Sequence, residues 1–204
     1  SSLFVVVLIT SAGSTVGIIC GYCGGVVDNI LMRIADIFLA FPGIVFAIAV
    51  ASVLSGGITS AVIAVAAVSW PKYARLARSE VLSVCASDYI KAARMSGMSE
   101  FGIIIKHIIP NIAGIIVTTA LLDIGHMMME IAGLSFLGLG AAPPAAEWGA
   151  MMSNGRSMLQ TAPWIILAPG VAIFVSVLIF NMFGESVKTR WNKNNRRTGY
   201  AGRQ

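Results

Sequence analysis

The sequence predicts an all-α membrane protein, a polytopic bundle of about five spanning helices. Only 11% of its 204 residues are charged, whereas a soluble domain carries about 25%. The mean hydropathy is correspondingly high, at +0.84. Long apolar stretches without strand-like alternation favour helices, because backbone groups in lipid must be satisfied within their own segment. Basic residues cluster between these stretches, as they do at membrane borders. This composition excludes a disordered chain, a disulfide scaffold and a nucleic-acid-binding domain.

Five stretches are long enough to cross about 30 Å of hydrocarbon as helices. They cover roughly residues 2–22, 30–54, 58–80, 111–134 and 163–185. In and just after the first stretch, Gly13, Gly17, Gly21 and Gly25 recur at every fourth position. This spacing predicts a smooth helix face that another helix can approach closely.

The basic residues predict the orientation of the chain. With five alternating spans, all of the 14 Lys and Arg residues except Arg156 fall on one side, which the positive-inside rule makes cytoplasmic. We therefore expect residues 1–187 to form a transmembrane domain and residues 188–204 a basic cytoplasmic tail. Ser1 would then lie outside, which implies an earlier span and six spans in the full protein.

The segment 83–110 is the longest loop on the predicted cytoplasmic side. A short helix is expected from Asp88 to a stop at Gly97, and a second helix from Ser99-Glu100 until Pro110 closes it. Two short helices joined at a glycine could form a protrusion that docks in a partner's groove. They could equally re-enter and pack against their own bundle, and residue types alone leave both alternatives open.

The same segment resembles the EAA loop of ABC importer permeases. The resemblance rests on Lys91-Ala92-Ala93, on Gly97, and on Ile109-Pro110 at the far end, with Lys91 standing where the family motif has Glu. In that family the loop forms the coupling helix that sits in a cleft of a cytoplasmic ATPase. The resemblance therefore implies that Lys91, Ala92, Ala93, Gly97 and Pro110 belong to an ATPase-coupling surface.

Further segments are similar to the dipeptide, oligopeptide and nickel permeases of this family. They include Asp28-x3-Met32-Arg33-x2-Asp36, Phe41-Pro42, Trp70-x2-Tyr73-Ala74-Arg75, 132–140, Glu147-Trp148-Gly149 and Phe180-Asn181. The resemblance implies a subunit of the bacterial inner membrane. Its partners would be a homologous second permease subunit, two ATPase subunits and an extracytoplasmic substrate-binding protein.

The chain carries no energy source of its own. No GxxxxGK[ST] loop occurs in the sequence, so ATP and Mg²⁺ are expected on the partner ATPase, with no cofactor bound by this chain. Enzyme motifs are missing as well, because neither histidine belongs to an HExxH pair and no G-x-S-x-G elbow occurs. A transport subunit is expected rather than an enzyme.

The fourth span carries an unusual polar face, formed by Asp123, His126, Met127 and Glu130 at helical spacing. Ionisable groups inside a span are costly unless they are paired or face a cavity, so they are candidates for a translocation path. Asp123, His126 and Met127 also offer donors that could transiently contact nickel. Three alternatives stay open: pairing of Asp123 with His126, a water-filled path for peptides, and methionine as core filler.

Residues 122–128 resemble the nickel-uptake permease subunit and relatives that import metallophore complexes. The resemblance implies nickel or a nickel chelate as cargo. The alternative cargo is a dipeptide or oligopeptide, and a remote alternative is a passive channel or a structural membrane subunit.

The segment 139–163 is expected on the outside. Pro143-Pro144 should break any helix that continues from the fourth span, and a short helix is predicted at about 146–160. Trp148 and Trp164 suit the membrane interface. This helix could gate the exit, dock the binding protein, or form an inert lid.

Overall fold

A computed structural model describes residues 2–54, 56–141 and 145–201, with side chains described up to residue 190. Helices dominate, and the described residues contain no strand, which confirms the all-α prediction. In chain order the elements are α1 (Ser2–Cys23), α2 (Gly25–Leu39), α3 (Gly43–Val53), α4 (Ile58–Cys85), α5 (Asp88–Met95), α6 (Glu100–Ile103), the π-helix η1 (Ile104–Ile108), α7 (Ile109–Phe136), α8 (Trp148–Asn154), the 3₁₀-helix η2 (Arg156–Met158) and α9 (Trp164–Ala201).

Three helical stretches of the described chain are long and apolar enough to cross a membrane. They are α1, the continuous stretch Glu100–Phe136, and Trp164–Arg190 of α9. The pair α2 and α3 meets the same criteria only when it is taken as one bent span. The 28-residue α4 does not meet them, because basic residues occupy its second half.

The helix predicted over 30–54 is wrong as a single straight span. The structure breaks it between Leu39 and Gly43, and the axes of α2 and α3 meet at 94°. Pro42 stands at the N-cap of α3 and has no N–H with which to continue α2. Proline also disfavours helical backbone at the preceding residue, Phe41. The Phe41-Pro42 pair is therefore the physical cause of the break.

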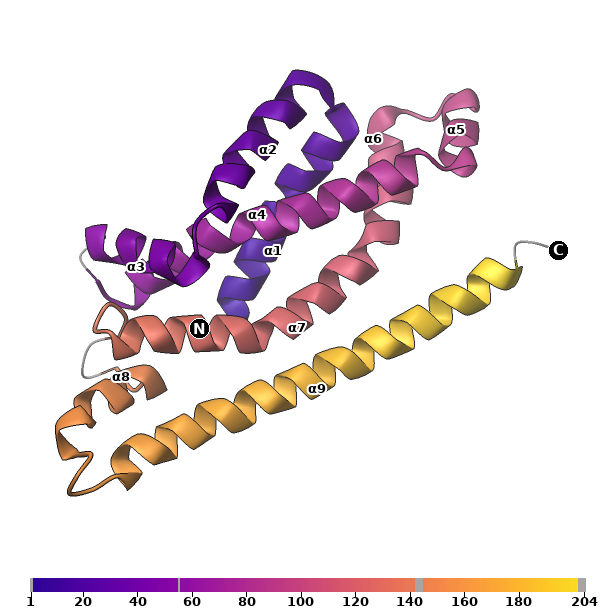
Figure 1. The fold of residues 1–204 in the computed structure, drawn as a ribbon. Coiled ribbons are helices and arrows are strands. Elements are labelled where there is room, and N and C mark those ends of the chain that lie inside the picture. Colours follow the sequence, from indigo (N-terminus) through magenta and orange to yellow (C-terminus); the bar gives the residue numbers. More distant parts are fainter. Residues whose placement is uncertain (1, 55, 142–144, 202–204) are drawn as a thin grey trace.

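Gly13, Gly17 and Gly21 of α1 pack against α4, as their spacing predicts. The two helices cross in Figure 1. A methyl group on Gly13 would lie 2.6 Å from the Trp70 carbonyl oxygen, and one on Gly21 would lie 2.9 Å from the Val81 Cβ atom. Both distances are too short for a real side chain, so glycine is required for this approach. Gly25 differs, because it lies past the end of α1 with nothing within 4 Å of its Cβ position.

Two buried clusters hold the bundle together. The first joins α1, α3, α4 and α7 around Ile9, Ala64, Tyr73 and Met127. The second lies at the other end of α4 and includes Ile90 of α5 and Ile103 of α6 among its members. The short helices between α4 and α7 therefore share a core with the bundle.

Pro110 does not end the helix that begins at Glu100, contrary to the sequence prediction. The backbone runs on from α6 through η1 into α7, and Pro110 lies in the first turn of α7. A proline ring clashes with the carbonyl four residues earlier, here that of Lys106. The wider π-turn of η1 contains Lys106 and removes this constraint, so the helix can continue.

The last helix lies along one side of the molecule (Figure 1). α9 packs against α7 and α8, and only 6% of its membrane-spanning window is buried. It continues as helix to Ala201, so the predicted tail at 188–204 begins as part of α9. The predicted helix at about 146–160 is divided into α8 and η2 at Gly155. Pro143 and Pro144 lie outside the described residues.

Candidate functional site

The predicted polar face of α7 divides into two parts in the structure. Asp123 and Met127 are buried, with 7% and 2% of their surface exposed. The side chain of His126 is 64% exposed, and that of Glu130 is 13% exposed. Positions on one stripe of a helix can therefore have very different surroundings, because α4 covers only part of the stripe.

Asp123 is held by two residues of α4. Lys72 Nζ lies 2.6 Å from each carboxylate oxygen, and Tyr73 Oη donates a hydrogen bond of 2.8 Å to Oδ2. Lys72 and Tyr73 directly follow Pro71 in α4. The pairing of Asp123 with His126, one of the sequence alternatives, is therefore not what the structure shows. Lys72 was missed as a site residue, although a costly intramembrane carboxylate already calls for a cation on a neighbouring helix.

Met127 belongs to the core between α4 and α7. Its sulfur lies 3.9 Å from Ser69 Oγ, which donates the contact, and its neighbours are the apolar residues of the first buried cluster. This environment agrees with the alternative that methionine fills the core here. The thioether has no open side from which cargo could approach.

His126 and Glu130 form a separate pair on α7, between an exposed imidazole and a largely buried carboxylate. His126 Nε2 lies 3.3 Å from Glu130 Oε1, one helical turn away. The second carboxylate oxygen of Glu130 is buried and has no hydrogen-bond partner. Of the four polar-face side chains, only the imidazole of His126 is largely exposed, whereas the unpartnered oxygen of Glu130 is enclosed.

The structure does not assemble the three predicted nickel donors into one site. Asp123 is occupied by Lys72 and Tyr73, Met127 is buried, and His126 is exposed. Within the described ranges, no group of three or more His, Cys, Asp and Glu side chains is placed to hold a metal ion. A metal contact by Asp123, His126 and Met127 stays a prediction, and of these three side chains only that of His126 is exposed.

The segment from α5 to η1, residues 88–108, forms a compact unit at the end of the bundle, here named the α5–η1 unit (Figure 1). Asp88 lies in the first turn of α5. Gly97 takes a φ of +81° just after the helix, as a C-terminal stop requires. Ser99 caps α6 by accepting a hydrogen bond of 3.2 Å from Gly102 N–H. The predicted helix starts and the glycine stop are therefore confirmed.

Of the predicted coupling residues, Lys91, Ala92 and Gly97 are exposed on this unit, Ala93 is half-buried, and Pro110 lies beyond it in the first turn of α7. Lys91 Nζ lies 2.8 Å from Asp88 Oδ1 within the same helix. Two large apolar side chains, Met95 and Phe101, are 89% and 73% exposed. The unit thus buries Ile90 and Ile103 inward while it presents an apolar surface outward. The segment therefore packs on its own bundle, as one of the two alternatives predicted, and it also leaves an apolar surface exposed. Docking of that surface to a partner stays a prediction.

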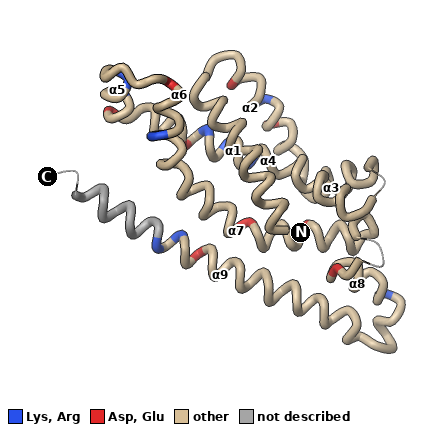
Figure 2. Tube along the Cα trace, turned by 180° about the vertical axis from the view of Figure 1, so that it is seen from behind, with Lys and Arg blue, Asp and Glu red and all other residues tan. Residues whose placement is uncertain are grey.

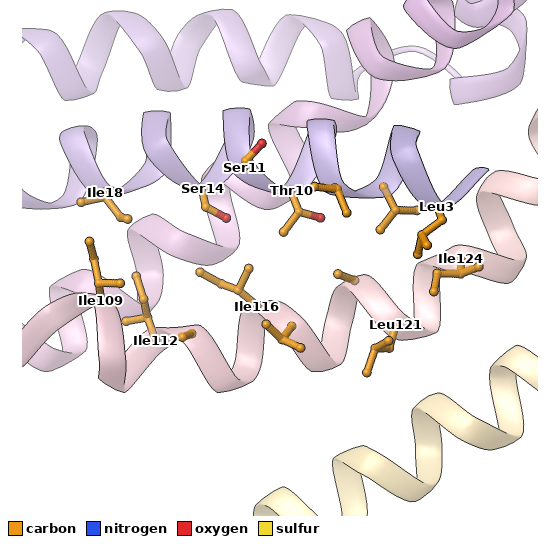
Figure 3. A pocket seen from close by; sticks show the side chains of 15 residues that line it. Leu3, Thr10, Ser11, Ser14, Ile18, Ile109, Ile112, Ile116, Leu121 and Ile124 are labelled. Atoms are coloured by element: carbon orange, nitrogen blue, oxygen red, sulfur yellow. The ribbon is translucent and has the colours of Figure 1, made fainter. Parts of the chain in front are cut away.

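A cavity of about 430 Å³ lies elsewhere, between α1 and α7 (Figure 3). Its walls are almost entirely carbon, with Ile112 and Ile116 facing Ser14 across the space. The hydroxyl of Ser14 is buried and has no hydrogen-bond partner. The four polar-face residues are not among the lining side chains, so this cavity is separate from the predicted cargo path.

The sequence is similar to several permease proteins of known name. It is 44% identical over 176 residues to the dipeptide transport system permease protein DppC of Alkalihalophilus pseudofirmus, covering 86% of this chain and 58% of that protein. It is 41% identical over 188 residues to the glutathione transport system permease protein GsiD of Pectobacterium atrosepticum, covering 92% and 62%. It is 38% identical over 181 residues to the nickel transport system permease protein NikC of Escherichia coli K12, covering 89% and 65%. The chain thus spans about 60% of the length of these relatives.

The fold also matches a solved structure, that of the MetNI methionine ABC transporter in an inward-facing conformation. The TM-score is 0.64 at 18% sequence identity, and the match covers 92% of this chain and 94% of the other. At this identity the likeness concerns the fold. The sequence profile of the family described as "Binding-protein-dependent transport system inner membrane component" matches residues 13–193. Since this match covers most of the chain, the protein belongs to the family of inner membrane components of binding-protein-dependent transport systems.

Proposed function

We propose that the chain is a membrane-spanning permease subunit of an ATP-driven ABC importer. Its family membership supports this function, as do the names of the relatives, which are all transport system permeases. The observation that carries the proposal is the α5–η1 unit, which is rooted in the bundle by Ile90 and Ile103 and presents Met95 and Phe101 outward. A soluble partner that binds and displaces such a unit would also displace the spanning helices on which the unit packs.

The proposed complex contains this chain, a homologous second permease subunit, two cytoplasmic ATPase subunits and an extracytoplasmic substrate-binding protein. ATP binding would close the ATPase dimer and draw the docked α5–η1 unit with it, which would open the spans outward to receive cargo. Hydrolysis would then reset the inward-facing state. In this arrangement the α5–η1 unit and the C-terminus lie in the cytoplasm of a bacterial cell.

Co-purification tests the docking step. We expect Ala92→Glu, which places a charge on the exposed side of α5, to reduce capture of the ATPase subunits by the tagged full complex. Ser186→Glu, at an exposed position of α9, is the matched control and should leave capture unchanged. A complex that forms without any ATPase and conducts solute without ATP would overturn the importer and favour the passive channel.

For the cargo, we propose a nickel chelate ahead of the bare nickel ion. The sequence of residues 122–128 resembles the nickel branch, and one relative is named a nickel permease. Asp123 is already bound by Lys72 and Tyr73, which argues against a bare ion, because a bare ion needs several free protein ligands. A chelate brings its own ligands and needs from the path only weak contacts, such as those that the exposed His126 can provide.

A dipeptide is the second candidate cargo, favoured by the 44% identity to a dipeptide permease. Uptake by the reconstituted complex with its binding protein separates the two. We expect radioactive nickel citrate to accumulate with ATP, and an excess of unlabelled dialanine or glutathione not to compete. Accumulation of labelled dialanine, with nickel citrate excluded, would replace the first candidate by the second.

A further inference from the structure

A group of three polar side chains joins the end of α1 to the α5–η1 unit. Tyr22, in the last turn of α1, donates a hydrogen bond through its hydroxyl to Glu100 at the start of α6. Arg94, in the last turn of α5, lies 3.5 Å from the same carboxylate and donates to the Tyr22 hydroxyl at 3.4 Å. The Arg94 guanidinium also lies over the Tyr22 ring, 5.7 Å from its centroid. One residue from each of three helices therefore meets at one point.

A separate contact ties the other end of α5 to α7. Asn111 Nδ2 donates a hydrogen bond of 3.0 Å to Tyr89 Oη, and the Tyr89 ring lies 6.1 Å from that of His107. Between the two polar contacts, Ile90 is buried in the second cluster. Helix α5 is thus held at both ends, at one end by α1 and at the other by the start of α7.

The contacts around Tyr22 are too exposed to contribute much to stability. The side chains of Arg94 and Glu100 are 50% and 64% exposed, and ion pairs of this kind contribute at most about 1 kcal/mol. The buried isoleucines already anchor the unit. The three residues instead fix the orientation of α5 and α6 relative to the end of α1, because the contacts of a planar guanidinium and a hydroxyl group are directional.

We propose that Tyr22, Arg94 and Glu100 form a clamp through which movement of the α5–η1 unit is passed to α1. They act as positioning residues, since the partner ATPase would contact α5 and the clamp would carry the displacement onward. Because α1 packs closely on α4 through Gly13, Gly17 and Gly21, a displaced α1 takes α4 with it. This inference rests on the proposed function, as it assumes that an ATPase moves α5.

The test measures an ATP-driven distance in the complete complex, which requires no cargo. Spin labels are placed at Ile19→Cys on α1 and Ile179→Cys on α9, both exposed, after the native cysteines have been replaced. We expect ATP with Mg²⁺ to shift this distance in the parent complex. Tyr22→Phe should abolish most of the shift while the ATPase subunits remain bound. An unchanged shift in Tyr22→Phe would overturn the clamp.

Charge exchange gives the second test. Arg94→Glu and Glu100→Arg should each abolish the shift, and the double variant, which re-forms the ion pair with the charges exchanged, should restore it; a double variant without the shift would count against the pair as part of the clamp. Tyr89→Phe removes a tyrosine hydroxyl that contacts α7 rather than α1, and should keep the α1 shift. Exchange of the charges of the exposed pair Glu185 and Lys188 on α9 is the control, and it should leave the shift unchanged. If the parent complex binds no ATPase or shows no ATP-driven shift, the proposed function fails; failure confined to the variants concerns the clamp alone.

Discussion

At the scale of single residues, Asp123 shows what sequence reasoning can and cannot reach. Its position in an apolar span identified it as a group that needs a partner. The partner, Lys72, lies 51 positions earlier in the chain, and only the packing of α4 on α7 brings the two together. His126, three residues further on the same helix, is exposed. The rotation of one helix against another decides these roles, and no local pattern records it.

The ion pair between Lys72 and Asp123 predicts how the protein responds to substitution of Asp123. Asp123→Ala should destabilise the protein by about 2 kcal/mol, because it leaves Lys72 and the buried Tyr73 hydroxyl without their acceptor. Thermal unfolding of the detergent-purified complex measures the loss. The double variant Lys72→Met with Asp123→Leu should recover much of it. A single variant as stable as the parent would contradict the pairing.

His126 is predicted to affect transport more than stability. Its side chain is exposed and its contact with Glu130 is a single pair at 3.3 Å within one helix, so His126→Ala should change the unfolding temperature little. If His126 meets cargo, initial uptake of nickel citrate should fall several-fold. Met129→Ala, at another exposed position of α7, is the control and should retain uptake. Equal uptake in the two variants would remove His126 from the cargo path.

Among the elements, α5 was predicted well and the α6–α7 connection poorly. The ends of α5 depend on local effects that can be predicted from residue type. Asp88 places a carboxylate in the first turn, and Gly97 takes the positive φ that ends the helix. Pro110 failed as a stop because η1 widens the helix ahead of it. The break at Phe41-Pro42 was missed for the opposite reason, since a long apolar stretch outweighed a proline signal.

The contact between α1 and α4 is predicted to depend on the absence of side chains. A methyl group at Gly17 would lie 2.7 Å from the Ala77 Cβ atom. Gly17→Ala should therefore push the helices apart and cost about 1–3 kcal/mol, the usual range for overpacking. Gly170→Ala is the matched control, because its nearest neighbour is the end of a methionine side chain at 3.6 Å. Equal unfolding temperatures for the two variants would show that the approach of α1 to α4 is less tight than described.

On the scale of the whole molecule, the placement of charge is the feature that sequence anticipated most directly. Lys and Arg lie on α4, on α2, over the α5–η1 unit and on α9 toward its C-terminal end, while an isolated basic site lies beside α8 (Figure 2). Sequence could not predict how the helices pack, because hydropathy is nearly the same around each apolar helix. The exposed α9 illustrates this, since its apolar surface gives no sign of which side meets α7.

This distribution of charge predicts which end of the bundle lies in the cytoplasm. Under the positive-inside rule, the α5–η1 unit should be cytoplasmic and the segment of α8 and η2 should lie outside. Ser96 and Ser157 are exposed positions at the two ends, so each can carry a single cysteine in a background without Cys20, Cys23 and Cys85.

In intact spheroplasts, a membrane-impermeant maleimide should label Ser157→Cys. It should label Ser96→Cys only after permeabilisation, which also serves as the control that both thiols are reactive. The reverse pattern would place the α5–η1 unit outside. Because ATP is available only in the cytoplasm, that result would remove the basis for ATPase docking and, with it, the importer mechanism proposed above.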